Sequence, residues 1–159
     1  MKNVVMARID DRLLHGQVAV AWLPFINADE VVVIDDDSAA DEFMKELIMT
    51  SVPEGITAHV FTTSEASDYL NKFSVGERIL ILTKKITDIK ELRNKKINID
   101  TINLGGLGYI DGRRRYLNFI HLSEDEAKLI GELDESGCNF EIQMMPNDKK
   151  YSVKELLRG

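Results

Sequence analysis

The sequence predicts an α/β fold: a doubly wound, mainly parallel β-sheet of about seven strands with helices on both faces. Short apolar runs alternate with amphipathic stretches from end to end, which is the order of repeated β-α-β units. Several apolar runs lack polar alternation, as is typical of strands buried on both faces. The chain has 159 residues, of which 44% are hydrophobic and 30% charged. This length suits one core, so we expect a single domain over residues 1–159.

Seven segments are predicted to be strands because β-branched and aromatic residues crowd them. In chain order they are residues 3–9, 30–34, 57–61, 78–82, 101–104, 116–122 and 140–144. The stretch 116–122 has mixed polarity and is the weakest of them.

Six segments between the strands carry apolar residues at helical spacing. They are residues 16–26, 38–50, 64–73, 87–93, 123–136 and 152–157. Ser38 is a plausible N-cap for its helix, and Ser123 followed by Glu126 forms a capping box. In such a fold, ligands bind beyond the carboxyl ends of the strands, near a switch in strand order.

Bulk composition excludes several classes of protein. The net charge of −7 disfavours non-specific nucleic-acid binding and a peripheral membrane surface. A disulfide framework or thiolate metal site cannot be built from Cys138, the one cysteine. No signal peptide or membrane span is apparent, so we expect a cytoplasmic protein. The basic run 113–115 is expected to be a solvated loop or strand edge; docking an acidic patch of a partner is the alternative.

The most charged junction lies between the first strand and the first helix, where residues 8–18 read RIDDRLLHGQV. The segment holds Arg8, Asp10, Asp11, Arg12 and His15. It is too polar for a core, and perturbable charges gathered at such a strand end mark functional sites.

His15 suits a phosphoryl carrier. A neutral imidazole is nucleophilic, and its ordinary pKa near 6.5 keeps a neutral fraction at cellular pH. Arg12 and Arg8 can supply charge-assisted donors, and the helix start beside Gly16 can supply backbone N–H groups. Asp10 can either bond one ring nitrogen or hold an arginine. A capping or solvated histidine is the simpler alternative.

Other strand ends offer weaker candidates. Asp35, Asp36 and Asp37 resemble a Mg²⁺ site or a phospho-accepting aspartate, but no lysine is obviously placed as partner and the run suits a helix cap. An alternative role for Asp36 is to help position the His15 loop. We therefore expect no metal and no cofactor.

Two further strand ends lie on the ligand side of the predicted sheet. Thr83 can donate to a phosphate. Gly105 and Gly106 lack the spacing of a dinucleotide-binding loop and are better explained by a backbone that approaches the site or a partner.

The segment 8–18, followed by Trp22, closely resembles the signature of the IIB components of the mannose/fructose/sorbose family of the sugar phosphotransferase system (PTS). The likeness continues in the same order along the chain. Residues 31–37 (VVVIDDD) are similar to the family's second strand, 102–107 (INLGGL) to its Gly-Gly loop, and 143–146 (QMMP) to its closing strand.

The resemblance implies a protein-phosphohistidine–sugar phosphotransferase. His15 would accept a phosphoryl group at Nδ1 from a IIA partner, expected to be a separate chain. It would pass the group to a sugar bound by the membrane components IIC and IID. The sugar remains open, and a homo-oligomer is compatible with the sequence. From the residues alone, the competing function is a regulatory module that binds phosphate or a nucleotide without a covalent step.

Overall fold

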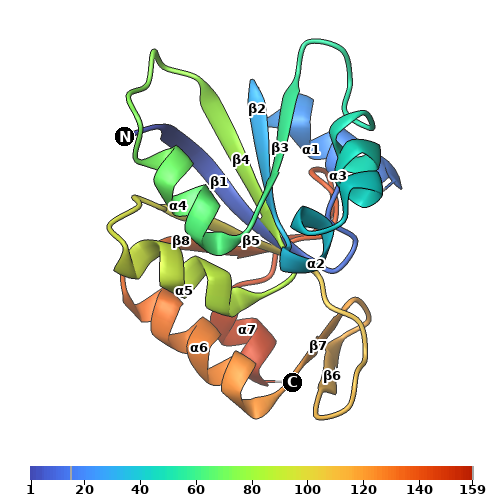
Figure 1. Cartoon of the computed structure of the whole chain (residues 1–159). Coiled ribbons are helices and arrows are strands. Elements are labelled where there is room, and N and C mark those ends of the chain that lie inside the picture. The colour runs from blue at the N-terminus through green and yellow to red at the C-terminus, as the bar shows by residue number, and fades with distance from the viewer. Residues whose placement is uncertain (15, 159) are drawn as a thin grey trace.

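A parallel β-sheet forms the centre of the computed structural model, which describes residues 1–14 and 16–158 (Figure 1). Its strand order is β3-β2-β4-β1-β5-β8, and every neighbouring pair is parallel. The strands are β1 (Asn3–Asp10), β2 (Glu30–Ile34), β3 (Thr57–Phe61), β4 (Arg78–Thr83), β5 (Thr101–Gly106) and β8 (Asn139–Ile142). All six were predicted from the sequence.

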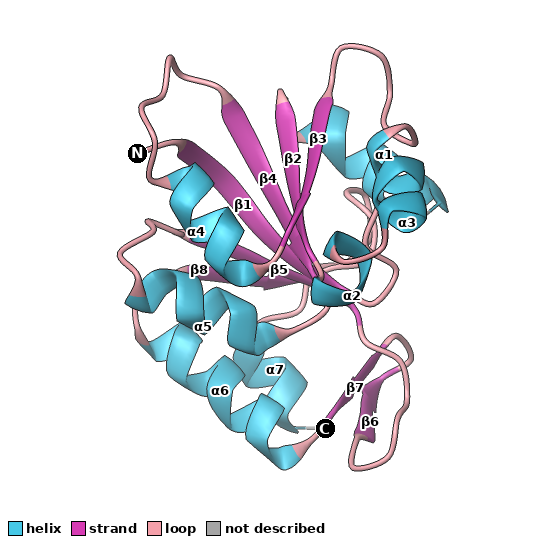
Figure 2. Cartoon of the chain, viewed as in Figure 1, coloured by secondary structure: helices cyan, strands magenta, loops and turns pink. Residues whose placement is uncertain are grey.

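Helices cover both faces of the sheet (Figure 2). One face carries α1 (Gly16–Phe25), α2 (Asp36–Ala39) and α3 (Glu42–Met49). The other carries α4 (Thr63–Leu70), α5 (Ile86–Asn94), α6 (Glu124–Glu135) and α7 (Val153–Arg158). The doubly wound architecture is therefore confirmed. Within the described residues, no helix combines the length and apolar character that crossing a membrane would need.

Two apolar clusters hold these layers together, one on each face. Along β4, Ile79 and Ile81 pack into the cluster that includes α4 to α7, whereas Leu80 and Leu82 pack into the cluster beneath α1. Both sides of the strand are buried, which explains the absence of polar alternation.

The sheet reverses its winding between β1 and β4, which are neighbours. From β1 the chain continues into α1 on one face, and from β4 it continues into α5 on the other. Ile9 of β1 pairs with Thr83 of β4, so the two strands end at the same level. This is a topological switch point, the place where open α/β sheets bind ligands.

The predicted helix 38–50 is wrong in one respect, because the chain forms two helices there. Asp35 caps α2 by accepting from the backbone of Ser38, and Asp41 caps α3 by accepting from Phe43 and Met44. Ser38 lies inside α2 and is not an N-cap. An aspartate side chain readily accepts hydrogen bonds from the free backbone N–H groups of a helix start. Asp41 also has an extended backbone, which separates α2 from α3.

The predicted strand 116–122 is also corrected. The chain forms an antiparallel hairpin of β6 (Arg114–Leu117) and β7 (Ile120–Leu122), separate from the main sheet. Two hydrogen bonds join the hairpin to Leu107, the residue after β5. Leu107 N donates to Phe119 O at 2.9 Å, and His121 N donates to Leu107 O at 2.8 Å. The turn between the two strands explains the mixed polarity of this stretch.

Candidate functional site

Asp10, the last residue of β1, is the centre of the hydrogen bonds at the switch point. Its Oδ1 accepts from the backbone N and Nε of Arg12 at 3.0 and 2.9 Å. Its Oδ2 accepts from Arg12 Nη2 at 2.8 Å and from Arg8 Nη2 at 3.0 Å. Of the two roles open to Asp10, the described residues show it holding arginines. Arg8, Asp10 and Arg12 are called the Arg–Asp cluster below.

Arg8 is the buried member of this cluster, with a side chain only 1% exposed. Besides Asp10, it donates to Asn103 Oδ1, to the Gln143 carbonyl at 3.1 Å and to the Met144 carbonyl at 2.8 Å. Burial lowers the pKa of Arg8 to about 10, against the opposing effect of Asp10, so it stays charged near neutral pH. Its guanidinium lies 4.9 Å from the Trp22 ring, whose Nε1 also donates to Met144 O. Arg8 thus joins segments that are distant in the sequence.

Gly105 and Gly106 leave the space that the two guanidinium groups occupy. A Cβ on Gly105 would lie 2.2 Å from Arg8 Cζ, and one on Gly106 would lie 3.0 Å from Arg12 Nη2. The backbone of this strand end therefore approaches the two arginines closely. The reason is steric, because neither glycine has a left-handed backbone.

Arg12 is the member of the cluster that reaches solvent. Two of its side-chain nitrogens bind Asp10, yet the side chain remains 39% exposed. Among the groups that the structure describes, its backbone N, Nε and Nη2 have hydrogen-bond partners and its Nη1 has none. Arg12 therefore presents a fixed cation at the protein surface, three residues before His15.

Asp11 faces away from the cluster and binds the loop after β5. Its Oδ2 accepts from Gly108 N at 2.7 Å and lies 3.6 Å from Arg113 Nη1. Arg113 also forms two hydrogen bonds with Glu126, at 2.9 and 3.0 Å. The prediction of a solvated basic run is thus wrong for Arg113, whose side chain is only 9% exposed. Burial opposes ionisation of Glu126, but the bonds from Arg113 and Ser123 keep its pKa below the usual range.

The backbone of the loop is shaped by its own residues. Leu13 has a φ of 51°, and its N donates to Asp10 O at 3.1 Å. Leu13 and Leu14 are buried in the apolar cluster beneath α1, which fixes the loop to the core. Gly16 has a φ of 69° and begins α1. His15 itself lies outside the described residues, but its neighbours on both sides are placed.

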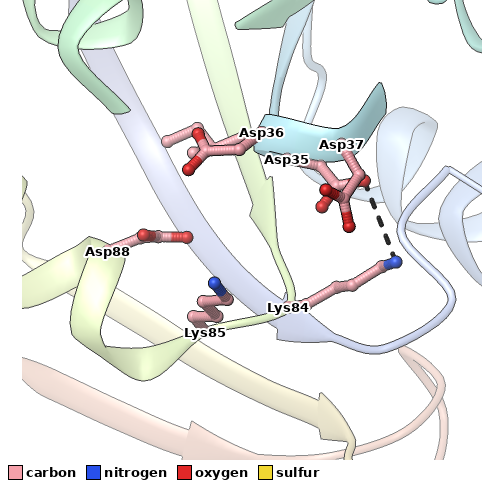
Figure 3. Close-up of a pocket in the computed structure, with 7 residues that line it drawn as sticks. Asp35, Asp36, Asp37, Lys84, Lys85 and Asp88 are labelled. Atoms are coloured by element: carbon pink, nitrogen blue, oxygen red, sulfur yellow. Dashed lines mark ion pairs between the residues drawn. The ribbon is translucent and has the colours of Figure 1, made fainter. Parts of the chain in front are cut away.

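The acidic run after β2 lines a pocket of about 230 Å³ together with residues that follow β4 (Figure 3). Lys84 Nζ lies 3.8 Å from Asp35 Oδ2, which corrects the expectation that no lysine is placed beside this run. Asp35 has a structural task as well, since it accepts from Ser38 N and from Ser38 Oγ. In the described part of the chain, no three His, Cys, Asp or Glu residues are grouped to hold a metal ion.

Thr83 and Asp36 are both associated with this acidic pocket: Thr83 contacts Asp88, one of its lining residues, and Asp36 lines it directly. Thr83 is fully buried and donates to Asp88 Oδ2 at 2.5 Å. Burial raises the pKa of Asp88, although its bonds from Thr83 and Thr63 act in the opposite direction. Asp36 lines the same pocket and makes no hydrogen bond or ion pair with the described loop residues. Roles for Thr83 and Asp36 in the site stay predictions.

A second cavity lies directly beside the His15 loop, and the sequence did not reveal it. This loop pocket, of about 370 Å³, is bounded by the loop on one side and by α2, α3 and the end of β4 on the other. Its lining includes Arg12, Leu14, Gly16, Met44 and Lys84. Lys84 is the charged residue that sequence reasoning missed. Its place immediately after a buried strand was the signal that the sequence offered.

The fold and the site together define a doubly wound α/β protein with an exposed arginine in the loop at its switch point. The model of the family described as "PTS system sorbose subfamily IIB component" matches residues 4–159. The chain belongs to this family.

Relatives and solved structures agree with that assignment. The fructose-specific EIIB component of Bacillus subtilis is 31% identical over 100% of this chain and 98% of its own length. The mannose-specific EIIAB component of Escherichia coli K12 is 32% identical over 96% of this chain, which spans only 47% of that protein. The crystal structure of manxB from Thermoanaerobacter tengcongensis superposes with a TM-score of 0.90 at 34% identity, covering 99% of this chain and 96% of its own.

Proposed function

We propose that this protein is a phosphoryl carrier in sugar import and that His15 is the residue that carries the phosphoryl group. The observation that carries the proposal is the fixed, solvent-reaching guanidinium of Arg12, held by buried Asp10 beside the His15 loop at the switch point. A planar cation held in this way suits the oxygens of a phosphoryl group. Family membership supplies the chemical context.

In the first transfer, the phosphorus atom exchanges an imidazole nitrogen of the donor for an imidazole nitrogen of His15. The lone pair of the unprotonated His15 nitrogen, Nδ1, forms a new P–N bond while the P–N bond to the donor histidine breaks. The donor nitrogen leaves with that electron pair, so the step needs no oxidant or reductant. Its main requirements are in-line positioning and charge compensation, and Arg12 provides the second.

The second transfer delivers the group to a sugar. A sugar hydroxyl oxygen attacks phosphorus, the P–N bond to His15 breaks, and the hydroxyl proton is released. We propose a IIA protein as donor, the membrane components IIC and IID as the place where the sugar is bound, and the cytoplasm as the location. The relatives' names include mannose, fructose, sorbose and N-acetylgalactosamine, and the sugar of this chain is among such compounds.

The roles of the remaining loop residues follow from their contacts. Arg8 is enclosed and its two terminal nitrogens already have four acceptors, so it positions Asp10 and does not touch phosphate. Asp11 fixes the loop to the segment after β5. Gly16 has a left-handed backbone and begins α1, so the free N–H groups of that helix start follow the loop directly in the chain and are available to a phosphoryl group.

Intact mass after incubation with a phosphorylated IIA donor tests the proposal. The wild type should gain about 80 Da, the mass of one phosphoryl group, and the adduct should be labile to acid and hydroxylamine. His15→Ala should gain nothing. Absence of the adduct on wild type with a donor that phosphorylates another IIB protein would refute the carrier function. Labelling that survives in His15→Ala and disappears in Asp36→Asn would identify an aspartate acceptor instead.

A further inference from the structure

We infer that Lys84 is a second phosphoryl-binding cation and that the loop pocket is the site in which the transferred group lies. The inference rests on the proposed function and adds a residue from a different strand. Lys84 follows β4 directly, and the pairing of Thr83 with Ile9 places it level with Asp10 across the switch point.

The position of Lys84 is the first argument. It lines the loop pocket together with Arg12, Leu14 and Gly16, the residues that surround His15 in sequence. Arg12, which follows the end of β1, and Lys84, which follows the end of β4, therefore border the same cavity. A phosphoryl group between them would meet cations from two sides, which compensates its charge better than one contact.

Charge balance is the second argument. The Arg–Asp cluster contains two guanidinium groups and one carboxylate, so it retains one net positive charge. Asp11 also lines the loop pocket and adds a negative charge there, 3.6 Å from Arg113. A phosphoryl group on a side chain carries about 1.5 to 2 negative charges near pH 7. The cluster alone leaves part of that charge uncompensated. Arg113 cannot supply the rest, because it is engaged by Asp11 and Glu126.

The freedom of Lys84 to move is the third argument. Its one ion pair within the described residues is long, 3.8 Å to Asp35, and its side chain is 44% exposed. Such a pair contributes little, so it is readily exchanged for a doubly charged group. Asp35 would keep its two bonds from Ser38 after the exchange. In Figure 3 Lys84 extends toward Asp35, whereas Lys85 lies nearer to Asp88.

Lys85 is a matched control for Lys84. It is the next residue, it carries the same charge, and it lines the acidic pocket but is absent from the lining of the loop pocket. Its side chain makes no capping hydrogen bond to α5. Neutralising Lys85 therefore changes the net charge of the protein by the same amount and leaves the loop pocket intact.

The test is the second-order rate constant for phosphoryl acceptance from phosphorylated IIA, measured by rapid quench for wild type, Lys84→Gln, Lys84→Arg and Lys85→Gln. Loss of a charge-assisted contact should slow Lys84→Gln by about tenfold to hundredfold. Lys84→Arg should restore most of the rate, and Lys85→Gln should match wild type. Urea unfolding of each variant should give a stability close to that of wild type, because the pair that Lys84 loses is long and its lysine is partly exposed.

The outcomes separate the two proposals. If wild type accepts no phosphoryl group, the proposed function fails and this inference fails with it. If wild type accepts the group and Lys84→Gln is as fast as Lys85→Gln, the carrier function stands and the role of Lys84 is refuted. Equal slowing of Lys84→Gln and Lys85→Gln would also refute it, because the effect would then be that of net charge alone.

Discussion

Substitution of Gly105 by alanine tests how rigidly Arg8 is held. The new Cβ would lie 2.2 Å from Arg8 Cζ and 2.2 Å from its Nη2, far inside van der Waals contact. Arg8 has no room to retreat, because its terminal nitrogens bind Asp10, Asn103 and two carbonyl groups of the 143–144 segment. The alanine therefore either strains the strand or expels the guanidinium from its acceptors.

The magnitude follows from these two alternatives. Overpacking of a filled core costs about 1 to 3 kcal/mol, and breaking a buried ion pair costs about 3 to 5 kcal/mol. We expect Gly105→Ala to lower the free energy of unfolding by about 3 to 5 kcal/mol. For a chain of this size, that corresponds to a fall in Tm of roughly 6 to 20 °C.

Two other glycine substitutions serve as controls in the same urea and thermal unfolding assay. Gly106→Ala meets Arg12 Nη2 at 3.0 Å, but this is the end of a partly exposed side chain that can shift, so the expected cost is within about 1 kcal/mol. Gly131→Ala lies in α6 at an ordinary 3.8 Å from Leu157 and should stabilise by roughly 0.5 to 1 kcal/mol. A Gly105→Ala protein as stable as Gly106→Ala would refute the rigid enclosure of Arg8.

Three further predictions concern charge. Arg12→Ala should slow phosphoryl acceptance by about a hundredfold or more and change the free energy of unfolding little, since Arg12 is partly exposed; an unchanged rate in a quench assay would contradict its role. Glu126 has a lowered pKa when folded, so its contribution to stability is present above the ordinary value of 4.5 and is lost as pH falls through the lowered one. The stability difference between wild type and Glu126→Gln, from urea unfolding, should therefore shrink as pH falls below 4.5, and a constant difference would count against it. The acceptance rate should rise with pH over the range in which imidazole titrates, about pH 5 to 8, and a flat profile would argue against attack by His15.

The layout of the sheet was predictable because it follows from local patterns. Strands buried on both faces give unbroken apolar runs, as in β2 and β4, and a concentration of β-branched and aromatic residues marked the other strands of the main sheet. The errors arose where local signals compete. Ser38 and Asp41 both suit an N-cap, and only the folded backbone shows that Asp41 begins a new helix.

The location of the site was predictable from the sequence, but the separate roles of its residues were not. Arg8 and Arg12 look alike in the sequence, yet β1 directs Arg8 inward beside Asn103 and leaves Arg12 in the exposed loop. Arg113 looked like a solvated charge because Glu126, its partner, lies 13 residues away. Lys84 was missed because its neighbour across the switch point comes from another strand.

The enclosure of Arg8 has a consequence for protein engineering. The segment 8–18 reads as a compact motif, but its geometry depends on Gly105 and on the carbonyl groups of Gln143 and Met144, more than 90 residues further along the chain. A graft of the motif alone onto another parallel sheet would leave Arg8 with Asp10 as an acceptor, but without its three other acceptors and without the space that Gly105 provides. The smallest portable unit is therefore discontinuous: the loop, the glycine pair ending β5 and the turn after β8 must be moved together.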